Sequence, residues 1–265
     1  MFVEDNSRSS KYNGQQMEMR YICSVIERIV MRMKAKLVTL AAALLVSAAT
    51  LLPTSGIAAQ DWHRVGVNRT PEVVGNGQVV TQQRPVGAFR DISLNGSGDL
   101  IVRIGPERSL SVTADSNVLP LLGQRIKDGK LILEPRHSYR TRTRPRYVVT
   151  VPALDSVGIG GSGHAEVDGV VSDRFALAIG GSGSIVAKGR ARQLSLAIGG
   201  SGDIDARALR ASSVAVTIGG SGSARVATNG PLSGTIAGSG SIRYLGRPSA
   251  IAVTRVGAGT VAPLR

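Results

Sequence analysis

Cysteine is almost absent from this chain of 265 residues. The one cysteine, Cys23, lies in an N-terminal segment that we expect to be removed from the mature protein. A chain without cysteine forms no disulfide and offers neither a thiolate metal site nor a cysteine nucleophile. No cysteine follows the apolar leader either, which argues against lipid attachment. We predict no metal and no cofactor.

Aromatic residues are also scarce, at 3% of the chain, although 42% of the residues are hydrophobic. A compact globular core usually depends on large aromatic side chains. A thin solenoid instead fills a narrow interior with Val, Ile, Leu, Ala and Gly. The composition therefore favours a solenoid over a globule.

Acidic residues are few compared with basic ones, 18 Asp and Glu against 32 Lys and Arg, and the formal net charge is +14. A surface with this charge attracts polyanions. Most of the basic residues are dispersed, and we interpret them as charges that keep the outside of a solenoid soluble. They include Arg174, Arg192, Arg210 and Arg225.

Residues 1–59 have the layout of a leader with a secretory signal peptide. Basic residues precede an uncharged apolar run, 37–52, and small residues that suit cleavage follow it. A membrane anchor is the alternative, but these 16 residues are fewer than the roughly 20 that span a bilayer. We expect an exported protein, periplasmic, cell-surface or secreted, that has no membrane span after cleavage and does not meet nucleic acid. Translation from Met31 or Met33 would also give a conventional leader.

The tripeptide Gly-Ser-Gly recurs along the rest of the chain, and from Ser162 onward its serines are 18 to 20 residues apart. Such a period, with strand-like residues between the marks, is typical of a solenoid. A degenerate copy follows at residues 257–259. The serines are Ser97, Ser162, Ser182, Ser201, Ser221 and Ser239.

Apolar residues alternate with small or polar ones before each Gly-Ser-Gly, as at Leu194, Leu196 and Ile198, and again after it. A period of two indicates a strand with one buried face. About 20 residues are too few for a helical crossover, so we predict an all-β parallel β-helix, single-stranded, with rungs about 4.8 Å apart. Glycine permits tight corners, and the stacked serines would form a hydroxyl ladder without chemical function.

One arginine-rich stretch departs from the dispersed pattern, and its members are Arg136, Arg140, Arg142, Arg144 and Arg146. An extended backbone would place the last four on one face at about 6.6 Å spacing. Such a row could bind phosphate, sulfate or uronate groups. The alternative is a solvated loop or edge strand whose charges prevent aggregation, which Pro145 also suits.

Two further readings depend on acidic residues. The segment 199–205 is similar to calcium-binding nonapeptide repeats, but the residue after each Gly-Ser-Gly varies, so a calcium ladder would lack ligands. Asp203 and Asp205 alternate on one side of a strand and could serve as acid and base in a polysaccharide lyase or hydrolase. Nothing else in the sequence converges on them.

The histidines, His63, His137 and His164, are isolated, and we interpret them as surface residues.

The mature chain divides into a polar linker, 60–85, and a β-helix domain, 86–265. Between Ser97 and Ser162, strands are expected at 110–113, 130–133 and 147–151, with a helical turn or loop at 118–122. The arginine stretch would leave the solenoid as an excursion. The apolar register slips at 251–256, as expected of a capping rung.

The segment order resembles a known bacterial family. Phe89 to Ile92 lead into Asn95 to Leu100, Asp128 to Leu131 follow, and Gly-Ser-Gly rungs complete the pattern. This order, over about residues 86–247, is similar to the head GIN domain family of auto-transporter adhesins. The resemblance implies a right-handed parallel β-helix in an exported envelope protein, and it supplies no catalytic residues.

These observations together predict a non-enzymatic envelope module for binding or scaffolding, whose partner is an anionic polysaccharide or an envelope protein. Long flat faces suit extended partners. The alternative is a carbohydrate-active enzyme that uses Asp203 and Asp205. A structural spacer without a ligand remains a third hypothesis, and the oligomeric state is left open.

Overall fold

The computed structural model describes residues 72–264, so the predicted leader and Cys23 lie outside the described residues. The chain divides into two units, Met1–Gly66 and Val67–Arg265, and the described residues belong to the second. They form eighteen strands and one short 3₁₀ helix, η1 (Leu119–Leu121). The strands are β1 (Val73–Val74), β2 (Val79–Arg84), β3 (Asp91–Leu94), β4 (Asp99–Ile104), β5 (Ser109–Asp115), β6 (Leu122–Lys127), β7 (Lys130–Pro135), β8 (Tyr139–Arg140), β9 (Arg146–Val151), β10 (Ser156–Ile159), β11 (His164–Ile179), β12 (Ser184–Ile198), β13 (Asp203–Ile218), β14 (Ser223–Thr228), β15 (Leu232–Ala237), β16 (Ser241–Leu245), β17 (Ile251–Val256) and β18 (Thr260–Pro263).

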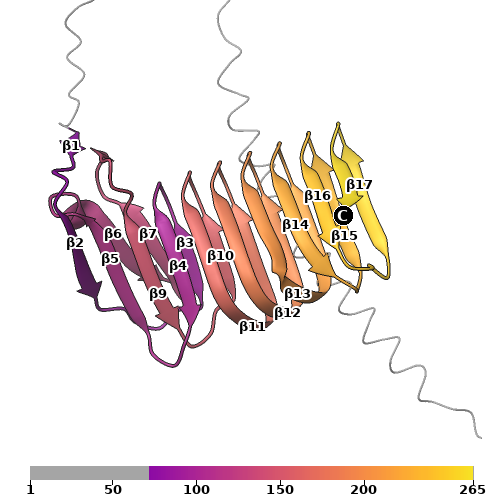
Figure 1. The fold of residues 1–265 in the computed structure, drawn as a ribbon, viewed down its shortest axis with the longest axis horizontal. Coiled ribbons are helices and arrows are strands. Elements are labelled where there is room, and N and C mark those ends of the chain that lie inside the picture. The colour runs from indigo at the N-terminus through magenta and orange to yellow at the C-terminus, as the bar shows by residue number, and fades with distance from the viewer. Residues whose placement is uncertain (1–71, 265) are drawn as a thin grey trace, which may run out of the picture. The chain divides into compact units, whose positions relative to one another are not determined.

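The strands build a β-solenoid of about five turns with rungs of about 20 residues, as predicted (Figure 1). Its first layer contains β7, β3 and β10, the second halves of β11, β12 and β13, and then β15 and β17. Its second layer contains β9 and β4, the first halves of β11, β12 and β13, and then β14, β16 and β18. Neighbouring strands within each of these runs pair in parallel.

The interior is a stack of equivalent apolar side chains. Ile179, Ile198, Ile218 and Ile236 are register partners from rung to rung, and all are buried. Burial alternates along each strand, as in β9, because successive side chains point to opposite faces. The predicted strands at 110–113, 130–133 and 147–151 are confirmed as β5, β7 and β9.

Each Gly-Ser-Gly corner joins a first-layer strand to a second-layer strand. A Cβ on Gly181 would lie 2.5 Å from the carbonyl oxygen of Gly161 in the neighbouring rung, so the corner backbones stack too closely for a side chain. The serines between the glycines are exposed, and the backbone amides of Ser201, Ser221 and Ser239 donate to glycine carbonyls of the preceding rung, as from Ser201 N to Gly181 O at 3.1 Å. No hydrogen bond within residues 72–264 joins two corner hydroxyls.

The rungs are not all stacked in sequence order. The rung of β3 and β4 lies between the rung of β7 and β9 and the rung of β10 and β11 (Figure 1). A tight hairpin explains the reversal: β6 and β7 pair antiparallel across Asp128 and Gly129, which both have positive φ, at 51° and 72°. This is the type I′ geometry that favours Asp-Gly.

Antiparallel strands close the end of the solenoid beside β9. Strand β5 pairs with β9, and β2 pairs with β5. The predicted linker, 60–85, is therefore wrong in its last part, since 79–84 form a strand. The burial pattern explains the error: β2 is exposed along almost its whole length, so it has no apolar alternation, and its partner is distant in sequence.

At the other end, β17 pairs with β15 and β18 pairs with β16. This last rung is less buried than the others, and Ile251 and Val256 are 47% and 65% exposed. Within the part of the chain that the structure describes, no helix is long and apolar enough to cross a membrane.

Candidate functional site

The arginine stretch forms an enlarged corner. Residues 136–145 connect β7 to β9, in the position that Asn95 to Gly98 occupy between β3 and β4 in the neighbouring rung. Only β8 within this loop is a strand, and it pairs in parallel with β1. The straight row of arginines expected from an extended backbone is therefore interrupted at 141–145. The stretch is an excursion from the solenoid, and we name residues 136–146, which include the first residue of β9, the arginine loop.

A buried carboxylate anchors the arginine loop to the end of the solenoid. Thr141 Oγ1 donates a hydrogen bond to Asp115 Oδ2 at 2.6 Å, and Asp115 is only 1% exposed. Thr143 N donates to Thr141 Oγ1 at 3.0 Å, and Gly75 N donates to the Arg140 carbonyl at 2.8 Å. These bonds hold the backbone while the intervening arginines point away.

All five arginines of the loop are exposed, and from Arg140 onward the residues that alternate with them are less exposed. Thr141 and Thr143 are half-buried, and Pro145 is buried. The half-buried threonines and the buried proline fix the backbone of the loop and leave the guanidinium groups in solvent. The exposed arginines are Arg136, Arg140, Arg142, Arg144 and Arg146.

Acidic groups neutralise this charge only weakly. Arg140 Nη2 lies 3.2 Å from Glu72 Oε2, and Arg144 Nη1 lies 3.5 Å from Asp99 Oδ1. The two arginine side chains are 76% and 62% exposed, and ion pairs in such positions contribute little. Among residues 72–264, the other three arginines of the loop form no ion pair. The loop therefore has an excess of positive charge that is free to meet an anion.

Two tyrosines stay neutral, Tyr139 within the loop and Tyr147 in β9 directly after it. Burial raises the pKa of Tyr139, and a hydrogen bond with Ser97 opposes this shift. Burial also raises the pKa of Tyr147, which lies in the core. Neither phenol supplies negative charge to the arginines at neutral pH.

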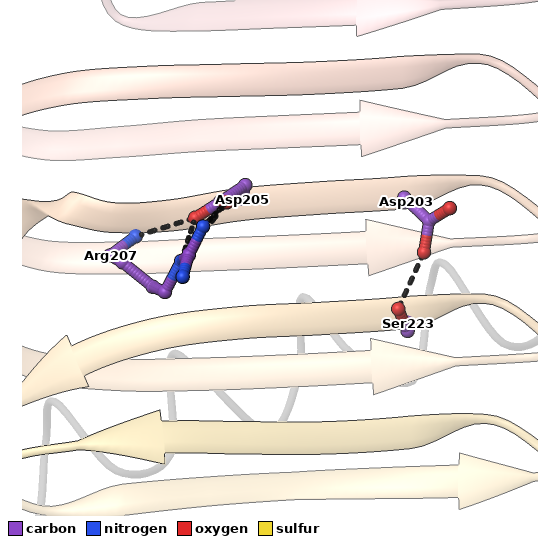
Figure 2. A network of polar contacts seen from close by, with 4 residues as sticks. All are labelled: Asp203, Asp205, Arg207 and Ser223. Carbon is purple, nitrogen blue, oxygen red and sulfur yellow. Dashed lines mark hydrogen bonds and ion pairs between the residues drawn. The ribbon is translucent and has the colours of Figure 1, made fainter. Parts of the chain in front are cut away.

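The candidate carboxylate pair, Asp203 and Asp205, lies on the outer face of β13 (Figure 2). Each carboxylate has its own partner. Asp205 accepts hydrogen bonds from Arg207, including Nε at 2.9 Å and Nη2 at 2.6 Å, while Asp203 Oδ1 accepts one from Ser223 Oγ at 2.5 Å. The Arg207 hydrogen bonds lower the pKa of Asp205, so this group stays ionised and is poorly suited to act as a general acid.

His164 is less isolated than the sequence indicated. Its Nδ1 lies 2.8 Å from Ser184 Oγ, because the two residues are register partners on adjacent rungs. Asp99 is its partner on the other side. No group of three or more His, Cys, Asp or Glu side chains within residues 72–264 is placed to hold a metal ion.

Some arginines that are dispersed along the sequence lie close together in the fold. One depression in the surface is lined by Arg174 and Arg192. A second is lined by Arg190, Arg192 and Arg210. For Arg190 and Arg210 the spacing was a signal that could have found them, because residues one period apart stack on adjacent rungs. Arg190 and Arg210 are 20 positions apart, one full rung.

The fold defines a class, that of β-solenoid domains built from parallel strands. Residues 88–248 match the family described as "Putative auto-transporter adhesin, head GIN domain". The match spans more than half of the chain, and the protein belongs to this family. The resemblance in the segment order is thereby confirmed.

Solved structures share the fold. A "putative adhesin" from Bacteroides fragilis is 21% identical with a TM-score of 0.60, and the match covers 72% of this chain and 100% of that one. A "Putative lipid binding protein" from Parabacteroides distasonis is 23% identical with a TM-score of 0.52, over 73% of this chain and 100% of that one. No curated protein gave a match.

Proposed function

We propose that this protein is an exported, non-enzymatic envelope module that binds anionic polysaccharide through its arginine loop. The observation that carries the proposal is the loop itself: five exposed arginines on a backbone held by the buried Asp115. Membership of an adhesin family supports a binding role. The leader predicted at 1–59 supports export.

Arginine suits this ligand class because its planar guanidinium group donates paired hydrogen bonds to carboxylate, sulfate and phosphate. A loop that is already ordered loses less conformational entropy on binding than a mobile one. Association should therefore depend strongly on salt, because the arginines are exposed and their interactions are screened.

The alternative of a carbohydrate-active enzyme has less support. An acid and base pair needs one carboxyl group that holds a proton near neutral pH. Asp205 is held ionised by Arg207, and Asp203 is bonded to Ser223. If Asp203→Asn abolished turnover of a glycan that the unchanged protein cleaves, the enzymatic alternative would replace the binding module.

The test is retention of the protein on an immobilised anionic polysaccharide at low and high salt. The variant changes Arg140, Arg142, Arg144 and Arg146 to serine. A matched control makes the same change at four exposed arginines outside the loop, Arg103, Arg108, Arg247 and Arg255. We expect salt-sensitive retention that is lost in the loop variant and kept in the control. Equal loss in both would show a non-specific effect of net charge, and no retention of the unchanged protein would contradict the proposal.

A further inference from the structure

The turns opposite the Gly-Ser-Gly corners form a groove. There β11, β12 and β13 bend from the second layer into the first, with a shift of register at each bend. Three depressions of about 810, 580 and 690 Å³ lie along this side. The first two share Val171 to Asp173 and Arg192, and the last two share Arg210 to Ser212, so they form one shallow groove that crosses successive rungs.

Small side chains form the floor of the groove. Ser172, Ala191, Ala211 and Thr228 are register partners on four successive rungs, and the last three of them are buried. Thr228 Oγ1 donates a hydrogen bond to the Ala211 carbonyl at 2.9 Å, so the hydroxyl group of the floor already has a partner within the protein. A row of small residues between longer exposed ones leaves room for an extended chain along the solenoid axis.

Arginines line this groove. Arg174, Arg190, Arg192 and Arg210 are all exposed. Arg192 Nη1 lies 3.6 Å from Asp173 Oδ1, but both side chains are about four-fifths exposed, which makes the pair weak. Within residues 72–264, the other three arginines have no acidic partner.

A fifth arginine at the groove is already neutralised. Arg90 donates from Nε and Nη2 to the two carboxylate oxygens of Asp155, at 2.5 and 2.8 Å. This pairing lowers the pKa of Asp155, so the carboxylate stays ionised beside Arg90. The free positive charge therefore belongs to the middle of the groove, over β11 to β13.

Arg190 and Arg210 are register partners on adjacent parallel strands of the groove, so their backbones are about 4.8 Å apart. Like charges directly opposite each other destabilise a sheet. An anion that accepts hydrogen bonds from both guanidinium groups would remove this repulsion, so the pair is complementary to a carboxylate placed between the rungs.

We propose that the groove is a second anion-binding site, for a linear glycan that carries carboxylates on successive sugars. One carboxylate of such a chain can lie between Arg190 and Arg210, whose rungs are about 4.8 Å apart, and its neighbours can meet Arg192 and Arg174 farther along the groove. The groove presents no exposed aromatic ring, because Phe175 in its lining is buried, so it lacks the stacking platform that single-stranded nucleic acid uses.

The proposal is independent of the arginine loop, which lies at the other end of the strands, between β7 and β9. Arg190→Ser with Arg210→Ser is the test variant. The chain offers a matched control in Arg225→Ser with Arg243→Ser, because these two are also arginine register partners on adjacent rungs but lie outside the groove. Both variants lose two positive charges.

The probe is an oligogalacturonate of defined length, titrated calorimetrically into the full chain that also carries the four loop substitutions. We expect the groove variant to bind about tenfold or more weakly, because two charge-assisted hydrogen-bonding groups are lost. The control should stay within about twofold. Neutral oligogalactan should bind neither variant.

Three results would overturn the proposal: equal losses in the groove variant and the control, unchanged affinity in the groove variant, or tighter binding of oligo-deoxythymidylate than of oligogalacturonate. If the arginine loop alone does not bind the glycan, the result is different: the four loop substitutions by themselves then leave the affinity for oligogalacturonate unchanged. A thermal melt checks folding, and the groove variant should melt at or above the temperature of the unchanged protein because a repulsive pair is removed.

Discussion

Gly202 is packed against Ile179 of the preceding rung. A Cβ on Gly202 would lie 2.6 Å from Ile179 Cγ2 and also 2.6 Å from the carbonyl oxygen of Gly183. Contacts this short do not occur, so the second glycine of each corner is required by the stacking of the rungs. The same relation joins Gly222 to Ile198 and Gly240 to Ile218.

We therefore expect Gly202→Ala to destabilise the protein by about 1–3 kcal/mol, the usual cost of an extra methyl group in a packed interior. The measurement is the midpoint of urea unfolding. The neighbouring Ser201→Ala is the control, and it should change stability by less than about 0.5 kcal/mol because Ser201 is exposed. An unchanged midpoint for Gly202→Ala would show that the corners are not tightly packed.

Thr141→Val should destabilise the arginine loop. The substitution removes the hydrogen bond to the buried Asp115 carboxylate, and a buried group without its partner costs about 1–3 kcal/mol. Amide hydrogen exchange should become faster across 136–145. Thr81→Val is the matched control, because Thr81 is exposed on β2 and its hydroxyl bonds to Thr113 in solvent. If the amides of 136–145 exchanged no faster in Thr141→Val than in the unchanged protein, this would contradict an anchoring role for Asp115.

Arg207→Ala should raise the pKa of Asp205. Hydrogen bonds from Arg207 are the main cause of the lowered pKa, and the charge of Arg225 makes the smallest contribution. A carboxyl group with a lowered native pKa stabilises the fold above its unfolded value, near 3.9, and this contribution is lost as pH falls through the native pKa. NMR titration of the Asp205 carboxyl carbon should show a larger rise of its pKa in Arg207→Ala than in Arg225→Ala. The reverse order would be inconsistent with the contacts in Figure 2.

Arg84→Met should loosen the antiparallel end of the solenoid. The guanidinium group donates to the carbonyls of Leu119 and Leu122, at 2.8 and 2.5 Å, and burial lowers its pKa. Methionine keeps an apolar stem but leaves both carbonyls without this donor, at a cost of about 1.5–3 kcal/mol. Hydrogen exchange in η1 and β6 reports the change. Arg108→Met removes an equal charge at an exposed position and should have no such effect.

Much of the fold follows from local periodicity. The core isoleucines recur every 18 to 20 residues, and each pairs with its equivalent on the next rung. Because neighbouring rungs are also neighbours in sequence over most of the chain, the repeat alone predicts strand positions, the buried face and the glycine corners. The sequence also predicted that the arginine stretch leaves the solenoid as an excursion, but it did not predict the hydrogen bonds from Thr141 to Asp115 and from Gly75 to Arg140 that hold this loop.

The remaining features depend on contacts between distant segments. The insertion of β3 and β4 between later rungs depends on which strands pair, and the Asp128–Gly129 hairpin that reverses the chain has no counterpart in the repeat. The sequence alone thus determined the solenoid, its rung length and its corners, because these repeat locally. Only the tertiary structure decided the order of the rungs, the closure by β2 and the meeting of Arg190 with Arg210, because the free energy of each depends on partners that a local pattern does not specify.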